Sequence, residues 1–185
     1  ALDSVPGRLE PVPDPSGRFV YVDYAHTPAA LENVLQCLQP LARGRIICVF
    51  GCGGDRDPGK RPQMGEIAAR MSDLAIVTSD NPRSENPARI IDQVLEGIRR
   101  ADVQAYSPEE LVRGLGARGY AVEPDRRRAI RLAVAAARPG DTILIAGKGH
   151  ETYQLLGARS IDFDDRAEAR RALADAADPA REDRN

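Results

Sequence analysis

The 185-residue sequence is poor in the residues that disulfide frameworks and metal centres require. It has three cysteines and two histidines. The cysteines Cys37, Cys48 and Cys52 are odd in number and clustered, which favours a reducing cytoplasm over a set of disulfides. Cys48 and Cys52 could form half of a zinc site, but both histidines lie far from them in the sequence. Buried thiols are therefore the better interpretation, and we expect no metal site.

An excess of charge of one sign and long apolar runs are also missing. Lysine and arginine number 26 against 28 acidic residues, a formal net charge of −2, which gives no reason to expect a nucleic acid or a membrane surface as partner. No apolar run approaches the roughly 20 residues that cross a bilayer. The first ten residues, ALDSVPGRLE, lack the basic and apolar parts of a signal peptide. The length suits one domain with a substantial core.

What the sequence does contain is an alternation of strand and helix patterns. Strands are predicted within 18–25, 45–51, 73–79, 119–123, 142–151 and 159–165, the last as an edge strand. Helices are predicted within 27–41, 60–72, 87–101, 108–116, 125–141 and 165–177. Thr27 is a plausible N-cap for the first helix, because Pro28 follows it at the first helical position.

This alternation predicts an α/β, Rossmann-like fold with a mostly parallel sheet and helices on both faces. Ligands of such sheets bind outside the carboxyl ends of the strands. Four polar loops follow predicted strands, and we expect them at one edge of the sheet. They are residues 22–28, 50–62, 78–85 and 146–151.

The loop GCGGDRDPGKR (51–61) resembles two nucleotide-binding motifs and matches neither. Arg56 stands where the third glycine of a dinucleotide fingerprint should be. The loop also reads GxxxxGK, but Arg61 stands where Ser or Thr would hold Mg²⁺. Asp55 and Asp57 would bring negative charge towards the phosphates. We therefore interpret the loop as a tight turn that presents Arg56 to an anion, with a purely structural turn as the alternative.

The loop TSDNPRSENP (78–87) could be an ordinary surface turn, because Asp, Asn, Pro and Ser are common turn residues. It could also recognise a zwitterion. Asp80 could bind an ammonium group and Arg83 could form a forked contact with a carboxylate. The glycine loop AGKGHE (146–151) carries Lys148, His150 and Glu151. Glu151 would add a second anion, and Arg56 would add a second cation. Two groups of each sign favour a zwitterion over a plain phosphate.

The loop VDYAHTP (22–28) offers a different set of groups. Asp23 could bind ribose hydroxyls, and the rings of Tyr24 and His26 could line an adenine or an apolar ligand stem. The alternative is a hydrogen-bonded network at the start of a helix.

Four motifs, VDYAHTPAALE, VFGCGGDRDPGKRPQMG, VTSDNPRSENP and AGKGHETYQ, resemble in order and spacing the C-terminal domain of the Mur ligases. The likeness covers about residues 8–166 and is greatest to the members that add meso-diaminopimelate to UDP-N-acetylmuramoyl-L-alanyl-D-glutamate in peptidoglycan synthesis. The resemblance implies that Asn81 and Arg83 bind the distal end of that amino acid. It also implies that Arg56, Gly147 and Glu151 complete the pocket, with Asp80 beside them. Nucleotide contacts would come from Arg8, Asp23, Tyr24 and His26.

The resemblance also implies partners that this sequence does not contain. Mur ligases have an N-terminal domain for the UDP-sugar peptide and a central ATPase domain, whose phosphate loop would bind most of the ATP and Mg²⁺. We expect residues 1–17 to be the end of the central domain and a hinge, 18–177 the amino-acid-binding domain, and 178–185 a flexible tail. We expect the longer enzyme to be a cytoplasmic ligase, and this chain alone to contain no catalytic residue and to be inactive.

Two other functions stay open at this point. The domain could belong to a related ligase of the folylpolyglutamate or cyanophycin type, although the intact Asp-Asn-Pro-Arg motif argues against it. Alternatively, the chain could be a stand-alone module that binds an amino acid or a nucleotide without catalysis.

Overall fold

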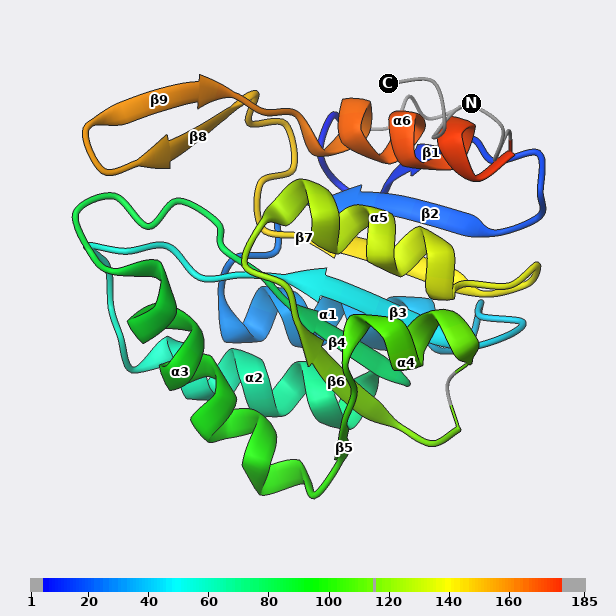
Figure 1. Cartoon of the computed structure of the whole chain (residues 1–185), viewed down its shortest axis with the longest axis horizontal. Coiled ribbons are helices and arrows are strands. Elements are labelled where there is room, and N and C mark those ends of the chain that lie inside the picture. Colours follow the sequence, from blue (N-terminus) through cyan, green and yellow to red (C-terminus); the bar gives the residue numbers. More distant parts are fainter. Residues whose placement is uncertain (1–4, 115, 178–185) are drawn as a thin grey trace.

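The computed structural model describes residues 5–114 and 116–177, and a seven-stranded sheet forms its centre (Figure 1). In spatial order the strands are β1 (Glu10–Val12), β2 (Phe19–Asp23), β7 (Thr142–Ala146), β3 (Ile46–Phe50), β4 (Leu74–Val77), β6 (Gly119–Val122) and β5 (Gln104–Ala105). Within the described residues of this sheet, β1 pairs antiparallel with β2, and the remaining neighbours are parallel. The predicted mostly parallel sheet is confirmed.

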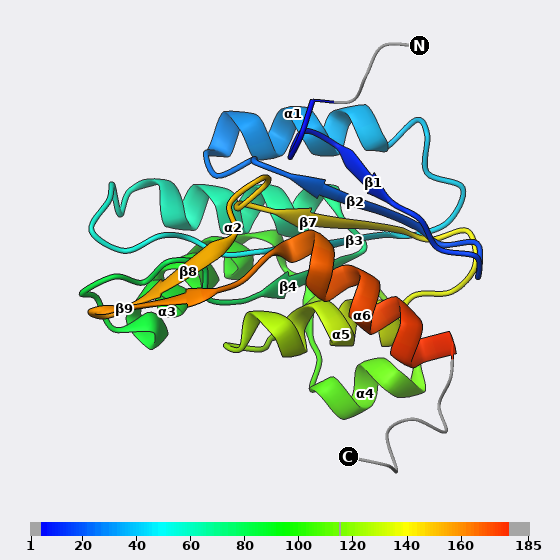
Figure 2. The ribbon, with the colours of Figure 1, turned by 90° about the horizontal axis from the view of Figure 1, so that it is seen from above.

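Helices cover both faces of the sheet, as the sequence predicts (Figure 2). The helices α1 (Pro28–Leu38), α2 (Lys60–Met71) and α3 (Pro87–Ile98) pack on one face, and α4 (Pro108–Arg113), α5 (Arg126–Ala136) and α6 (Asp165–Ala177) pack on the other. A short 3-10 turn, Arg99–Ala101, extends α3. In β3 the side chains of Ile47 and Val49 join one apolar core, and those of Cys48 and Phe50 join the other. Continuous apolar strands are therefore buried on both sides.

The helix starts follow from local sequence chemistry. The Thr27 hydroxyl accepts a hydrogen bond from the backbone N–H of Ala30, and Pro28 begins α1, as predicted. Asn86 caps α3 in the same way, and Asp125 caps α5. These caps fix where the preceding loops end, and therefore where the side chains of those loops lie.

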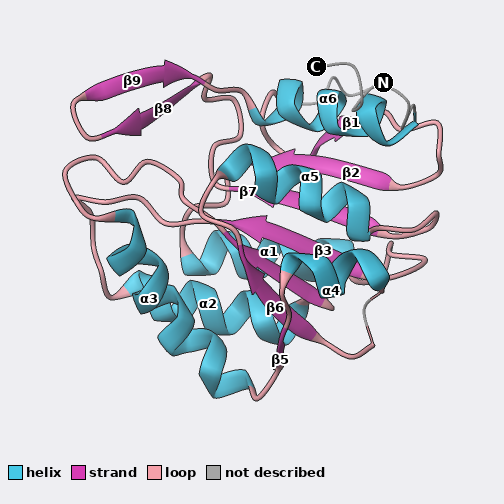
Figure 3. Cartoon of the chain, viewed as in Figure 1, coloured by secondary structure: helices cyan, strands magenta, loops and turns pink. Residues whose placement is uncertain are grey.

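The C-terminal region differs from the prediction. Residues 159–165 were expected to add an edge strand to the main sheet. Instead β9 (Arg159–Asp162) pairs antiparallel with β8 (Tyr153–Leu156), and the two form a separate hairpin that projects beyond the main sheet (Figure 3). The main sheet ends instead in the short strands β1 and β5, neither of which the sequence pattern indicated.

The expected domain division stays a prediction. Residues 10–12 form β1 and belong to the same sheet as β2, so a hinge would have to lie before Glu10. The expected flexible tail, 178–185, lies outside the described residues. In the part of the chain that the structure describes, none of the helices is long and apolar enough to cross a membrane.

Candidate functional site

Four loops meet where β2, β3, β4 and β7 end, and a cavity of about 590 Å³ opens between them. Figure 1 shows these strands pointing towards the same side of the sheet. All residues predicted to bind the amino acid line the cavity, together with two of the residues predicted to bind the nucleotide. They are Arg56, Asp80, Asn81, Arg83, Gly147 and Glu151, with Tyr24 and His26. The remaining lining includes Thr27, Pro28, Gly53, Asp57, Lys60 and Tyr153.

Asn81 and Arg83 lie on the loop between β4 and α3. The Asn81 side-chain Nδ2 donates a hydrogen bond to Glu151 Oε2 at 3.1 Å, which joins this loop to the one after β7. Arg83 has φ of +52°, and its Nη1 donates to the carbonyl oxygen of Gly54 at 2.7 Å. The backbone N–H of Arg83 donates to Leu155 of the hairpin at 3.3 Å. The loop is therefore held from two sides, and both side chains reach the cavity.

One oxygen of the Asp80 carboxylate faces a buried lysine of the protein itself. Its Oδ1 lies 3.0 Å from Lys148 Nζ, an ion-pair contact without the geometry of a hydrogen bond. Lys148 is fully buried, and burial lowers the pKa of its ammonium while the nearby Asp80 opposes that shift. From sequence, Lys148 was placed in the glycine loop without a role, because Asp80 and Asn81 lie far from it along the chain. The binding of a ligand ammonium by Asp80 stays a prediction.

Arg61 joins the loop after β3 to the loop after β4. Its guanidinium is buried and donates to both carboxylate oxygens of Glu85, at 2.8 and 2.9 Å, and to the carbonyl oxygen of Gly53 at 3.1 Å. The hydrogen bonds from Arg61 and from the Asp55 backbone lower the pKa of Glu85 to about 2. Arg61 therefore stands where a phosphate loop carries Ser or Thr, and its buried guanidinium joins two loops of the protein instead. Arg56, by contrast, is exposed at the mouth of the cavity.

Tyr24 lies at the centre of a second group of side chains. Its ring centroid is 4.5 Å from that of His26 and 5.3 Å from that of His150, and the Arg8 guanidinium lies 5.2 Å from it. His150 was not predicted as a site residue, because only the fold brings its loop beside Tyr24. These flat and cationic groups suit a planar ligand.

Asp23 does not line the cavity. Its carboxylate oxygens accept hydrogen bonds from the backbone N–H groups of Leu9 and Ala25, each at 2.8 Å. One of these contacts belongs to the predicted helix-start network, and the other holds the segment that carries Arg8. Lys60 similarly donates to the His26 carbonyl oxygen at 2.8 Å. The binding of ribose by Asp23 stays a prediction.

The described residues contain no group of three or more His, Cys, Asp or Glu side chains placed to hold a metal ion. Cys48 and Cys52 are buried, and burial raises the pKa of each thiol to about 12. At neutral pH both are therefore thiols rather than the thiolates that bind zinc.

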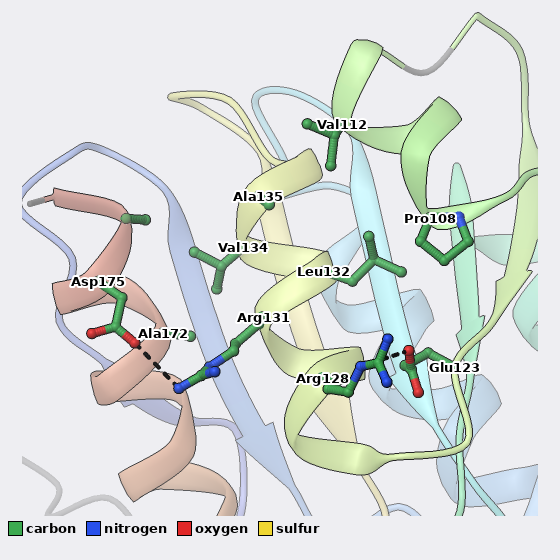
Figure 4. A pocket seen from close by; sticks show the side chains of 11 residues that line it. Pro108, Val112, Glu123, Arg128, Arg131, Leu132, Val134, Ala135, Ala172 and Asp175 are labelled. Carbon is green, nitrogen blue, oxygen red and sulfur yellow. Dashed lines mark hydrogen bonds and ion pairs between the residues drawn. The ribbon is translucent and has the colours of Figure 1, made fainter. Parts of the chain in front are cut away.

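A second cavity, of about 470 Å³, lies between α4, α5 and α6 (Figure 4). Its wall is largely apolar, with Leu132 of α5 facing Pro108 of α4. The charged side chains at its rim are paired, Arg128 with Glu123 at 3.2 Å and Arg131 with Asp175 at 3.4 Å. None of the four site loops lines it, and the groups that could bind a zwitterion lie in the first cavity.

Comparisons with known proteins show which family the chain resembles. The family model described as "Mur ligase, glutamate ligase domain" matches residues 7–149. The UDP-N-acetylmuramoyl-L-alanyl-D-glutamate--2,6-diaminopimelate ligase of Geobacter metallireducens is 59% identical over 169 residues, which are 91% of this chain and 33% of that protein. This chain thus spans about a third of that relative.

Two solved structures show how widely the fold is shared. A 2,6-diaminopimelate ligase of the same name is 40% identical with a TM-score of 0.80, and the match covers 95% of this chain and 33% of that one. Escherichia coli FolC, solved with ADP, is 21% identical with a TM-score of 0.55, over 81% of this chain and 30% of that one. The second likeness concerns the fold alone.

Proposed function

Because the chain belongs to the Mur ligase family, whose glutamate ligase domain it matches, we propose that it is the amino-acid-binding domain of a longer ATP-dependent ligase. That enzyme would join meso-diaminopimelate to UDP-N-acetylmuramoyl-L-alanyl-D-glutamate in the cytoplasm. The chain would bind the incoming amino acid and present its amine to the activated precursor, with the N-terminal and central domains as its partners.

The observation that carries this proposal is the mixed charge of the cavity at the loop edge. Cations from Arg56, Lys60 and Arg83 line it. Anions from Asp57, Asp80 and Glu151 line it as well. Diaminopimelate has a carboxylate and an amine at each end, so it can use groups of both signs along its whole length. Lysine lacks the distal carboxylate and would leave an arginine without a partner.

The residues of this chain would bind and orient rather than perform the chemistry. The Arg83 fork and the Asn81 amide would hold a carboxylate, and Glu151 would hold an ammonium group. ATP supplies the phosphoryl group that activates the D-glutamate carboxylate as an acyl phosphate. The free amine of diaminopimelate then attacks this carbonyl, forms the amide and releases phosphate. Fixing the amine in place lowers the entropic part of the barrier.

The loop 51–61 does not fit the triphosphate or its Mg²⁺. Arg61 is engaged by Glu85 rather than by a phosphate, and the Asp55 carboxylate accepts from Ser84 and would repel a phosphate. We therefore assign the phosphates and the metal to the central domain. Arg8, Tyr24 and His26 would meet the base or ribose of the nucleotide from this side.

A substrate screen with the longer protein tests the proposal. With ATP and the UDP-linked dipeptide, product should form with meso-diaminopimelate and far less with lysine, glutamate or aspartate. The 185-residue chain alone should hydrolyse no ATP. Glutamate addition to a folate would favour the folylpolyglutamate type, and binding without ligation by the longer protein would favour a stand-alone module.

A further inference from the structure

Lys148 is a fully buried lysine whose ammonium meets three oxygen atoms. Its Nζ donates hydrogen bonds to Asn81 Oδ1 at 2.9 Å and to the Tyr153 carbonyl oxygen at 3.0 Å, and it lies 3.0 Å from Asp80 Oδ1. An ammonium has three protons and cannot accept a hydrogen bond. Every group that Lys148 contacts must therefore turn an oxygen towards it.

This requirement fixes the orientation of the Asn81 side chain. An asparagine amide can rotate by 180° and exchange its oxygen with its NH₂ group. Here Oδ1 accepts from Lys148 Nζ at 2.9 Å and from the backbone N–H of Leu155 at 3.0 Å. A flipped amide would place its own N–H groups against two donors. The NH₂ group consequently points the other way, where it meets Glu151.

The consequence is a hydrogen-bond donor on the cavity side. One Nδ2 proton goes to Glu151 Oε2 at 3.1 Å, and Nδ2 has a second proton on a residue that lines the cavity. A donor at this position suits a ligand carboxylate. The contact with Asn81 also holds the Glu151 carboxylate at the cavity wall, where it can accept from an ammonium group.

We propose that Lys148 is a positioning residue, which sets Asn81 with its amide NH₂ towards the amino-acid carboxylate and thereby also orders Glu151. Lys148 itself would touch no substrate, because its side chain is fully buried and its ammonium is engaged within the protein. This role rests on the proposed function for the identity of the ligand. The orientation of the amide does not depend on it.

The competing explanation is that Lys148 only neutralises the buried Asp80. Buried ion pairs contribute little net stability compared with apolar side chains of similar shape, although removing one partner is costly. The two explanations differ in what happens when both charges are removed together. If Lys148 serves only Asp80, its loss should have no consequence once Asp80 is neutral.

The kinetic test is therefore Lys148→Met, measured in the longer ligase both alone and in an Asp80→Asn background. The neutral background avoids an unpaired buried carboxylate, which could unfold the single variant. In that background Lys148→Met should raise the KM for diaminopimelate about tenfold or more. The KM for ATP should stay within about twofold. Equal KM values for diaminopimelate in Asp80→Asn and in the double variant would overturn the proposal.

Asn81→Asp is the matched variant, since it replaces the NH₂ group with an oxygen of nearly the same size. Lys148 and Leu155 still find an acceptor, but the cavity now receives a negative charge instead of a donor. We expect the KM for diaminopimelate to rise at least as much in this variant as in the lysine variant, because the new oxygen also faces Glu151 Oε2. Unchanged diaminopimelate affinity would show that no donor is needed there, and would also overturn the proposal.

A nuclear magnetic resonance measurement on the 185-residue chain tests the orientation without any substrate. The hydrogen bond from Leu155 N–H to the Asn81 side-chain oxygen should give a scalar coupling between the Leu155 nitrogen and Asn81 Cγ. We expect this coupling in the wild-type chain and a weaker one in the Lys148→Met, Asp80→Asn double variant. Its absence in the wild type would overturn the proposal. Absence of ligase activity with the coupling present would instead overturn only the proposed function.

Discussion

Arg83 has a backbone conformation that side-chain-bearing residues seldom adopt, with φ of +52°. Such a residue persists where its surroundings hold it, and here the hydrogen bonds of its backbone to Leu155 and of its guanidinium to Gly54 do so. The bent backbone turns the guanidinium back over the loop and into the cavity wall, instead of letting it extend into solvent. The unusual backbone conformation of Arg83 therefore places its positively charged guanidinium at the cavity wall.

If the longer ligase prefers diaminopimelate over lysine as proposed, Arg83→Ala should abolish that preference. Leaving the buried distal carboxylate without its charge-assisted partner costs on the order of 2–5 kcal/mol, which lowers kcat/KM roughly 30- to 5000-fold. Lysine, which has no distal carboxylate, should be affected little. The KM for ATP serves as the control and should not move. If the preference for diaminopimelate survives, the loop is an ordinary turn.

Single residues also show what the sequence could and could not predict. Thr27 was predicted as an N-cap from the proline that follows it, and the contact is local, because its partner Ala30 lies three residues away. Lys148 could not be given a role, because two of its partners, Asp80 and Asn81, come from a distant loop that only the folded sheet brings beside it. The ion pair between Asp80 and Lys148 was missed for the same reason, since the two residues are distant in sequence.

At the scale of elements, the loop 51–59 and the loop 78–86 form one unit. The backbone N–H of Gly54 donates to the Asn81 carbonyl oxygen at 2.9 Å, and the Ser84 hydroxyl donates to Asp55 at 2.7 Å. A Cβ on Gly54 would lie 1.9 Å from the Pro82 carbonyl oxygen, so only glycine permits this approach. Arg61 and Glu85 close the unit with a paired contact.

The Arg61–Glu85 contact predicts a pH dependence. The pKa of Glu85 falls from 4.5 to about 2 in the folded chain, so its ionised form favours folding. The stability it contributes should be fully present above about pH 5 and lost as the pH falls towards 2. Melting temperatures of the wild-type chain and Glu85→Gln should therefore differ at pH 7 and converge in acid. Because Glu85 lies at the surface, high salt should reduce the difference at pH 7.

Arg70→Gln is a suitable control for that measurement, since the Arg70–Glu66 pair lies on the exposed side of α2 and away from both loops. Its melting temperature should follow that of the wild type across the pH range. A Glu85→Gln difference that is the same at pH 7 and pH 3 would contradict the prediction.

Elements with a strong period were predictable from sequence, and the pairing of β9 with β8 was not. The helices α1, α2 and α6 lie within or on the ranges that apolar spacing and caps indicated. The strand β9 lies within the predicted edge strand 159–165, but it is exposed along its whole length, so no buried face indicates which strand it pairs with. Its partner β8 has only one buried residue, Gln154, which donates to the Asp80 carbonyl oxygen. The hairpin is thus placed by contacts with a distant loop.

At the scale of the whole molecule, Asp23 joins the N-terminal segment to the sheet. Its carboxylate accepts a hydrogen bond from the backbone N–H of Leu9. The neighbouring Glu10 carboxylate accepts from the backbone N–H of Gly7 at 2.7 Å and forms an ion pair with Arg166 of α6 at 3.4 Å. Residues 7–10 are therefore held by β2 and α6 together, and Arg8 is held beside Tyr24.

We expect Asp23→Ala in the longer ligase to loosen this segment and displace Arg8. The KM for ATP should rise by on the order of tenfold, and the KM for diaminopimelate should rise much less, because the amino-acid residues lie on other loops. Steady-state kinetics with each substrate varied in turn would show the difference. A larger effect on diaminopimelate would place Asp23 with the amino-acid site.

The interlocked loops 51–59 and 78–86 also limit how this domain can evolve towards a different amino acid. A lineage that replaced only the segment around Arg83 would lose the partners of Gly54, Asp55 and Arg61, and with them the shape of both loops. The two segments must therefore be inherited together, and an engineer who wishes to exchange the selectivity of such a domain must transplant them as a pair. The sheet beneath them can remain as it is.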